Sequence, residues 1–153
     1  MKFEPTKEDF LWQTAKLFVI KGYKLFRMEV DERMTLTFYW YPKCGTCRNA
    51  KKWLEERNIE FQAVHIVEQP PSKEELKELY EKSGLELKKF FNTSGQKYRE
   101  LGLKDKVKTA TEDELLTLLA SDGMLIKRPL TTDGQKVTVG FKEDNFEMNW
   151  AQQ

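Results

Sequence analysis

The two cysteines of this chain lie three positions apart, in the stretch YPKCGTCRN at residues 41–49. Cys44 and Cys47 are candidates for a metal site, a structural disulfide, or a disulfide that forms and breaks as part of the protein's work. A tetrahedral zinc site needs four ligands, and the sequence adds only one histidine to these two thiols. A bridge across so short a loop would remove little entropy from the unfolded chain. Reversible thiol–disulfide exchange is therefore the favoured chemistry, with two merely small, apolar side chains as the alternative.

The residues around the two thiols predict different roles for them. An aromatic strand ending at Pro42, followed by an amphipathic helix, places Cys44 at the helix N-terminus, where free N–H groups and the helix dipole favour a thiolate. Cys47 falls one turn later on the apolar face and should be less exposed. We therefore expect Cys44 to attack a disulfide or oxidised substrate, and Cys47 to resolve the mixed species by forming a Cys44–Cys47 disulfide. Gly45 and Thr46 should form the tight turn and border the substrate groove.

Further candidates lie elsewhere in the sequence. A proline is tolerated in a sheet at an edge or at the start of a strand. Pro129 is therefore a candidate cis residue beside the groove, and Arg128 a candidate source of positive charge near Cys44. His65 alternates with apolar neighbours and is predicted to be an ordinary strand histidine. Residues 39–41 are predicted to be core and rim of the first strand.

The elements that must hold these residues are predicted by periodicity and by capping signals. Strand patterns over residues 35–41 and 61–67 flank the helix that follows Cys44, which indicates a right-handed parallel unit. Ser72 and Glu75 form a capping-box pattern for the next helix, which Gly84 ends. Two short helical pieces follow between residues 85 and 103, and a stronger helix runs from residue 111 to a glycine at 123. Strands MLIKRPL and KVTVGF around a TTDGQ turn, then a short helix FKEDNFEMNW, complete a small α/β sheet of the thioredoxin plan.

Composition narrows the classes of function. The chain has 153 residues, 39% of them apolar, which suffices for one domain. With 26 basic and 25 acidic residues the formal net charge is +1, so nothing favours direct binding to nucleic acid or to a membrane surface. Cysteine usage and the lack of a signal-peptide pattern predict a cytoplasmic protein, and the apolar stretch at residues 10–20 is shorter than a membrane span. We expect no cofactor and no metal.

Residues 1–33 fit the plan poorly and are predicted to be an N-terminal extension of unknown role, ahead of a domain at residues 34–150. Met34 is itself a candidate start. Alternatively, an amphipathic helix and a strand within the extension dock on the sheet or on a partner.

Five stretches in a fixed order carry a family resemblance. They are CGTCRN from Cys44, EQPPS from Glu68, YRELGL from Tyr98, LIKRPL from Leu125 and VGFKEDNF from Val139. Together they are similar to the arsenate reductase (ArsC) and Spx family, from residue 34 almost to the end of the chain.

The resemblance implies a thioredoxin-like mixed sheet with an inserted helical lobe. It also implies that Cys44 is the catalytic cysteine, Pro129 the cis-proline and Arg128 one arginine of an oxyanion-binding set. Arsenate reductases coupled to glutaredoxin have serine where this chain has Cys47, and their other two arginines fall at Asn92 and near residues 139–140. Spx regulators carry both cysteines as a disulfide switch and bind the α subunit of RNA polymerase.

From the residues and the resemblance together, we predict a thiol–disulfide oxidoreductase that resembles arsenate reductase. Cys44 is its nucleophile, Cys47 resolves the intermediate, and Arg128 supports the anion or thiolate. The expected partners are a thiol reductant, either thioredoxin or glutathione with glutaredoxin, or a protein disulfide client. The alternative is an Spx-like redox-sensing regulator that binds RNA polymerase.

Overall fold

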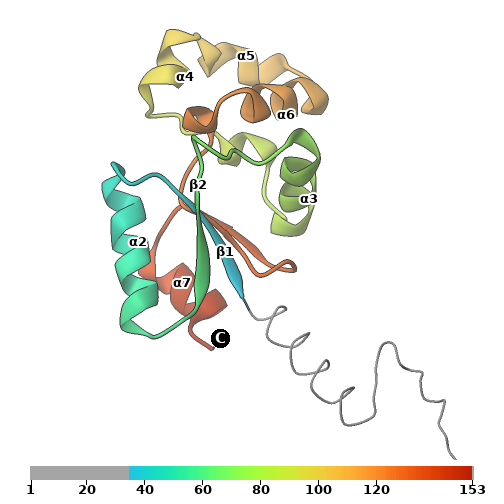
Figure 1. Ribbon diagram of the computed structural model, residues 1–153. Helices are drawn as coiled ribbons and strands as arrows, with labels where there is room; N and C mark the ends of the chain where they lie inside the picture. Colours follow the sequence, from blue (N-terminus) through green and yellow to red (C-terminus); the bar gives the residue numbers. More distant parts are fainter. Residues whose placement is uncertain (1–34, 153) are drawn as a thin grey trace, which may run out of the picture. The chain divides into compact units, whose positions relative to one another are not determined.

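The computed structural model describes residues 35–152, and a mixed four-stranded sheet lies at the centre of this part of the chain (Figure 1). The strand order is β2-β1-β3-β4. β1 pairs with β2 in parallel and with β3 in antiparallel orientation, and β3 pairs with β4 in antiparallel orientation. The strands are β1 (Leu36–Trp40), β2 (Phe61–His65), β3 (Leu130–Thr132) and β4 (Val137–Val139).

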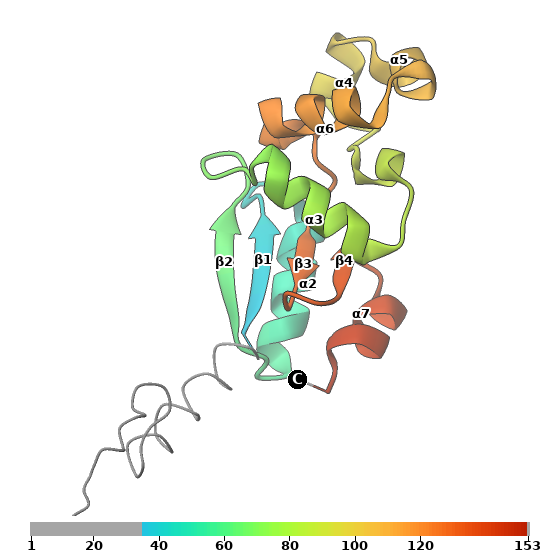
Figure 2. The same ribbon diagram turned by 90° about the vertical axis from the view of Figure 1, so that its right-hand side faces the viewer.

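Helices cover both faces of the sheet and form a lobe at one of its ends. Figure 2 shows α2 and α7 on one face and α3 on the other. The lobe, which contains α4, α5 and α6, lies beyond the C-terminal ends of β1 and β2 (Figure 1). The helical elements are α2 (Gly45–Glu56), α3 (Lys73–Ser83), η1 (Leu87–Phe90), α4 (Gln96–Glu100), α5 (Leu103–Thr109), α6 (Glu112–Ser121), η2 (Gly123–Leu125) and α7 (Glu143–Trp150).

One hydrophobic cluster joins β1 to α2 and α7. Leu36 and Phe38 alternate on β1 and are both fully buried, as expected for side chains of a central strand that point to the same face. The indole N–H of Trp150 donates a hydrogen bond to Thr138 Oγ1 at 3.1 Å, so that this large side chain is buried with its polar group satisfied. The cluster contains Leu36, Phe38, Ala50, Trp53, Leu54, Ile59, Phe146 and Trp150.

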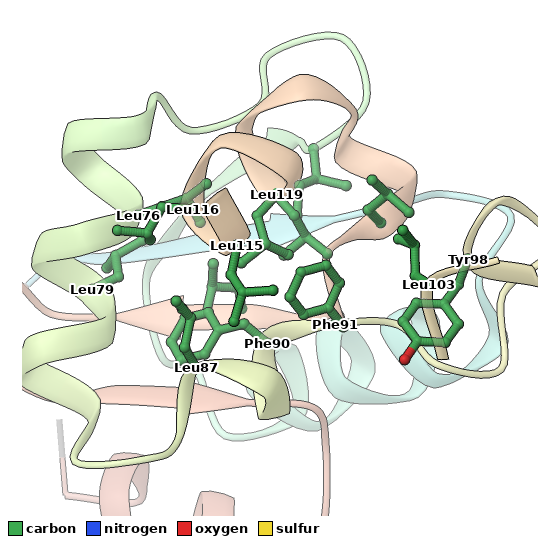
Figure 3. Packing of buried hydrophobic residues seen from close by; sticks show 14 of the residues in the cluster. Leu76, Leu79, Leu87, Phe90, Phe91, Tyr98, Leu103, Leu115, Leu116 and Leu119 are labelled. Carbon is green, nitrogen blue, oxygen red and sulfur yellow. The ribbon is translucent and has the colours of Figure 1, made fainter. Parts of the chain in front are cut away.

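A second cluster joins the lobe to α3 and to the other face of the sheet (Figure 3). Its side chains come from α3, η1, α4, α5 and α6 as well as from β3 and β4, so the lobe shares its core with the sheet. The labelled members are Leu76, Leu79, Leu87, Phe90, Phe91, Tyr98, Leu103, Leu115, Leu116 and Leu119.

The predicted starts of two helices are confirmed. Ser72 Oγ accepts a hydrogen bond from the Glu75 N–H at 3.1 Å at the start of α3, and Gly84 ends that helix with a φ of 69°. Thr111 Oγ1 accepts from the Glu114 N–H at 3.2 Å at the start of α6. The predicted last helix is also present as α7.

The prediction of a strand over MLIKRPL is wrong up to Pro129. Asp122 Oδ1 accepts a hydrogen bond from the Met124 N–H at 2.8 Å and caps the short helix η2, and beyond it Ile126 forms an isolated bridge with Phe91. β3 begins only at Leu130.

The hairpin prediction is correct, but its turn is shorter than TTDGQ. Thr131 and Thr132 belong to β3, and the turn begins at Asp133, whose Oδ1 accepts from the backbone N–H groups of Gln135 and Lys136 at 2.8 and 2.7 Å. The helix α5 was not predicted, and the predicted end of α6 at Gly123 is too late, because α6 ends at Ser121.

No helix in residues 35–152 is long and apolar enough to cross a membrane. The predicted extension at residues 1–33 lies outside the described residues.

Candidate active site

The loop between β1 and α2 holds Cys44 at the N-terminus of the helix. The Cys44 N–H donates to the Tyr41 carbonyl at 2.9 Å and closes a tight turn, and Arg48 Nη1 donates to the Pro42 carbonyl at 3.0 Å across the same loop. Cys44 is the N-cap residue of α2, and its Sγ accepts the backbone N–H of Cys47 at 3.4 Å. The sulfur of Cys44 thus occupies the place of a capping oxygen, where helix N–H groups favour negative charge.

Cys47 is the buried member of the pair. Its side chain has no exposed surface, whereas Cys44 is half-buried, and both thiols are free. Burial raises the pKa of Cys47 to about 12, and a hydrogen bond and the charge of Cys44 push it in the same direction. A backbone hydrogen bond from Tyr41 and the charge of Arg128 lower it. The predicted difference in exposure between the two cysteines is therefore present.

The effect of Cys44 on Cys47 depends on the chemical state of Cys44. A free Cys44 sulfur can carry negative charge, which opposes ionisation of Cys47 through repulsion and through the hydrogen bond between them. A Cys44 bound in a mixed disulfide carries no charge and no longer opposes it. Cys47 should therefore ionise more readily once Cys44 has reacted.

Replacement of Cys44 by alanine should lower the pKa of Cys47 from about 12, because two of the causes that raise it are removed. In this variant the thiolate absorbance in the ultraviolet comes from Cys47 alone, and it should rise at a lower pH than the Cys47 step of the wild type, which is the later of its two thiolate steps. The Cys44→Ala/Cys47→Ala double variant supplies the tyrosine background for subtraction. A Cys47 step at the same pH as in the wild type, or at higher pH, would show that Cys44 does not act on Cys47.

Arg128 and Pro129 lie where the chain enters β3. The Arg128-Pro129 peptide bond is cis, as the family resemblance implied, and the Pro129 carbonyl accepts from the Gly140 N–H at 2.8 Å. The β1–β3 ladder ends with the pair Tyr39 and Leu130. Pro129 directly precedes Leu130 and therefore lies at the same end of β1 as the cysteine loop.

The Arg128 guanidinium is held from two sides. Its Nη1 donates to the carbonyls of Met124 and Ile126 at 3.2 and 3.1 Å, and its Cζ lies 5.3 Å from the centroid of the Tyr41 ring. Arg128 Nε is buried and has no hydrogen-bond partner among the described residues. Arg128 is thus close enough to affect the ionisation of Cys47, whereas its predicted role as a positive charge near Cys44 stays a prediction.

The other predicted residues differ in their relation to the pair. Gly45 and Thr46 form the exposed first turn of α2 directly after Cys44. His65 ends β2, and its Nδ1 accepts from the Glu68 N–H at 3.2 Å, which fits the prediction of an ordinary strand histidine. Within residues 35–152 no group of three or more histidine, cysteine, aspartate and glutamate side chains could hold a metal ion.

Sequence reasoning missed Tyr41, which it assigned to the core and rim. Tyr41 touches both cysteines through its main chain and Arg128 through its ring. Its place three residues before Cys44 was the one available signal, since a tight turn at a helix start commonly uses the carbonyl of that residue.

Comparisons with known proteins identify the family. A model of the ArsC family matches residues 39–149. The chain is 79% identical over 118 residues to the uncharacterized protein YusI of Bacillus subtilis (strain 168), an alignment that covers 77% of this chain and 100% of YusI. It is 34% identical over 106 residues to the regulatory protein MgsR of the same organism, covering 69% of this chain and 82% of MgsR.

Among solved structures, an ArsC family related protein from Bacteroides fragilis matches with a TM-score of 0.73 at 50% sequence identity. The match covers 76% of this chain and 98% of that one. The mixed sheet with its helices is thioredoxin-like, as predicted from the order of the elements. The chain belongs to the ArsC family.

Proposed function

We propose that this protein is a thiol–disulfide oxidoreductase in which Cys44 is the nucleophile and Cys47 the resolving thiol. The observation that carries the proposal is the position of the Cys44 sulfur. It caps α2, accepts the Cys47 N–H at 3.4 Å, and is half-buried while Cys47 is fully buried. An incoming substrate can therefore reach Cys44 first, at the positive end of the α2 dipole.

The reaction proceeds in two exchanges. The Cys44 thiolate attacks one sulfur of a substrate disulfide, a bond forms between the two sulfurs, and the second substrate sulfur leaves as a thiolate. Cys47 then loses its proton to solvent and attacks the Cys44 sulfur, which releases the first substrate sulfur as a thiolate. The substrate disulfide has gained two electrons and is reduced to two thiols, while the protein dithiol is oxidised to the Cys44–Cys47 disulfide.

Neighbouring groups support these steps. The Arg128 charge lowers the pKa of Cys47 against the effect of burial and so favours the second exchange. Gly45 and Thr46 carry little side-chain bulk beside Cys44, and Pro129 is proposed to border the substrate groove. A thiol reductant in the cytoplasm, thioredoxin or glutathione with glutaredoxin, would return the two electrons.

Arsenate itself is a poorer substrate in this proposal. Of the three oxyanion-binding arginine positions of the family, this chain has an arginine at residue 128. A second position is Asn92, whose backbone N–H donates a hydrogen bond to the Leu125 carbonyl at 2.8 Å. Gly140 is near the third. A single guanidinium gives fewer bidentate contacts to the oxyanion than three would.

The Cys47→Ser variant should retain a stoichiometric mixed disulfide on Cys44 when it is treated with an oxidised small thiol. The wild type should release that thiol and form its internal bridge. Intact-mass spectrometry distinguishes the two products by the mass of the adduct. The Cys44→Ser variant is the matched control and should carry no adduct. A Cys47→Ser variant that first carried the adduct and then released it as fast as the wild type would exclude Cys47 as the resolving thiol.

A redox-sensing regulator is the second candidate, favoured by the 34% identity to MgsR, a regulatory protein. In this candidate the Cys44–Cys47 disulfide changes the affinity for a partner, proposed to be the α subunit of RNA polymerase. An enzyme should catalyse repeated reduction of a disulfide with thioredoxin or glutathione as reductant. A sensor should hold one redox state and bind the polymerase subunit with different affinity when oxidised and reduced.

A further inference from the structure

We propose that the Tyr41 side chain is a positioning residue that holds the Arg128 guanidinium beside the Cys44–Cys47 pair. The inference rests on the proposed thiol–disulfide exchange. In it, the Tyr41 side chain affects the rate of the second exchange, the attack of Cys47 on the mixed disulfide. Three sets of contacts support it.

The main chain of Tyr41 is tied to both cysteines. Its carbonyl accepts the Cys44 N–H at 2.9 Å, and its backbone hydrogen bond to the Cys47 thiol lowers the pKa of that thiol. Any residue at this position supplies the same main-chain groups. A substitution of Tyr41 can therefore test the side chain while it leaves these two contacts available.

The ring of Tyr41 lies between Arg128 and His65. The Arg128 Cζ is 5.3 Å from the ring centroid, within the range of a cation–π contact. The His65 ring meets the Tyr41 ring edge to face, with centroids 5.6 Å apart and an interplanar angle of 86°. The half-buried ring is thus held on one side by β2 and supports the guanidinium on another.

Arg128 needs this support because its other contacts fix only one of its nitrogens. Nη1 donates to the Met124 and Ile126 carbonyls, whereas the buried Nε has no partner among residues 35–152. The two carbonyl contacts hold the Nη1 end of the guanidinium, and the aromatic ring adds a contact near its central carbon. The charge of Arg128 lowers the pKa of Cys47, so the orientation of this group bears on the thiol that must ionise second.

The aromatic face, not the hydroxyl, carries the role. The contacts of the Tyr41 side chain with Arg128 and with His65 are made by its ring. Tyr41→Phe keeps the face and Tyr41→Leu removes it, so the two variants form a matched pair.

The test uses dithiodipyridine, an uncharged disulfide that has no carboxylate to compete for Arg128. In stopped flow, attack by Cys44 releases one thiopyridone, and attack by Cys47 on the mixed disulfide releases the second. Tyr41→Leu should slow the second release by roughly three- to tenfold, the size expected for loss of a cation–π contact. Tyr41→Phe should retain most of the rate.

A double-mutant cycle shows whether Tyr41 acts through Arg128. Arg128→Met should also slow the second release, and adding Tyr41→Leu to it should slow that release little further, because the group that Tyr41 positions is already gone. Additive effects of the two substitutions, or a Tyr41→Leu rate equal to that of the wild type, would overturn the positioning role. Chemical denaturation of each variant separates a loss of fold from a loss of rate.

The same traces separate this inference from the proposed function. A wild type that releases the first thiopyridone but never the second would refute the resolving role of Cys47, and with it the role of Tyr41. Two clear phases in the wild type with no change in Tyr41→Leu would refute the role of Tyr41 alone.

Discussion

The Cys44→Ser variant should lose reduction of small disulfides by at least about a thousandfold, since the nucleophile itself is removed and a serine hydroxyl does not ionise at neutral pH. The remaining Cys47 is fully buried, and burial, the largest cause of its raised pKa, persists without Cys44, so it cannot take over the first attack at comparable rate. The measurement is turnover of a disulfide substrate coupled to a thioredoxin system.

Cys47→Ser is the companion variant in this measurement. It should perform the first exchange at near the wild-type rate and then stop with substrate bound to Cys44. If Cys44→Ser retained turnover while Cys47→Ser lost the first exchange, the two cysteines would have the opposite roles.

The Gly123→Ala variant should lose about 3 kcal/mol or more of unfolding free energy, an effect at the upper end of those known for overpacking. A Cβ at residue 123 would lie 2.1 Å from the Ile66 carbonyl oxygen and 2.8 Å from its carbon. Both are main-chain atoms at the end of β2, so relief requires the backbone to shift. The contact joins the lobe, where Gly123 begins η2, to the sheet.

Urea denaturation followed by circular dichroism measures this loss as a lower midpoint. Gly45→Ala is the matched control, because a Cβ there would meet only the flexible end of Arg48, at 3.9 Å. Its effect should stay within about 1 kcal/mol, the usual size of a glycine-to-alanine change in a helix. A Gly123→Ala midpoint equal to that of Gly45→Ala would mean that the lobe and β2 can separate without cost.

Elements with a regular apolar period or a capping residue could be predicted from the sequence. The apolar face of α2 and the caps at Ser72 and Thr111 depend on contacts between residues three or four positions apart, so the local sequence is enough to predict them. The MLIKR run has the composition of a strand, yet Asp122 caps a short helix there and the Lys127 N–H bonds to the Phe90 carbonyl at 2.7 Å. That outcome depends on η1, a partner more than thirty residues earlier.

The same distinction applies to the site. The relation of Cys44 to Cys47 is local to one helical turn, so spacing predicted it. Arg128 comes near Cys44 and Cys47 only because β3 pairs with β1. The sequence indicated this position indirectly, through a proline at the start of a strand. The contact of Tyr41 with Arg128 needs both the local turn and this non-local pairing, and no pattern in the sequence could reveal it.

The full burial of Cys47 behind the half-buried Cys44 also bears on damage by peroxide. Overoxidation of a thiol to sulfinic or sulfonic acid requires that the oxidant reach an exposed thiolate. Of the two cysteines, Cys44 is the one with exposed surface. A sulfenic acid formed on Cys44 would lie within reach of a shielded thiol, which can condense with it and expel water before a second oxidant molecule arrives. The product would be the Cys44–Cys47 disulfide, which thiol reductants can convert back to two thiols.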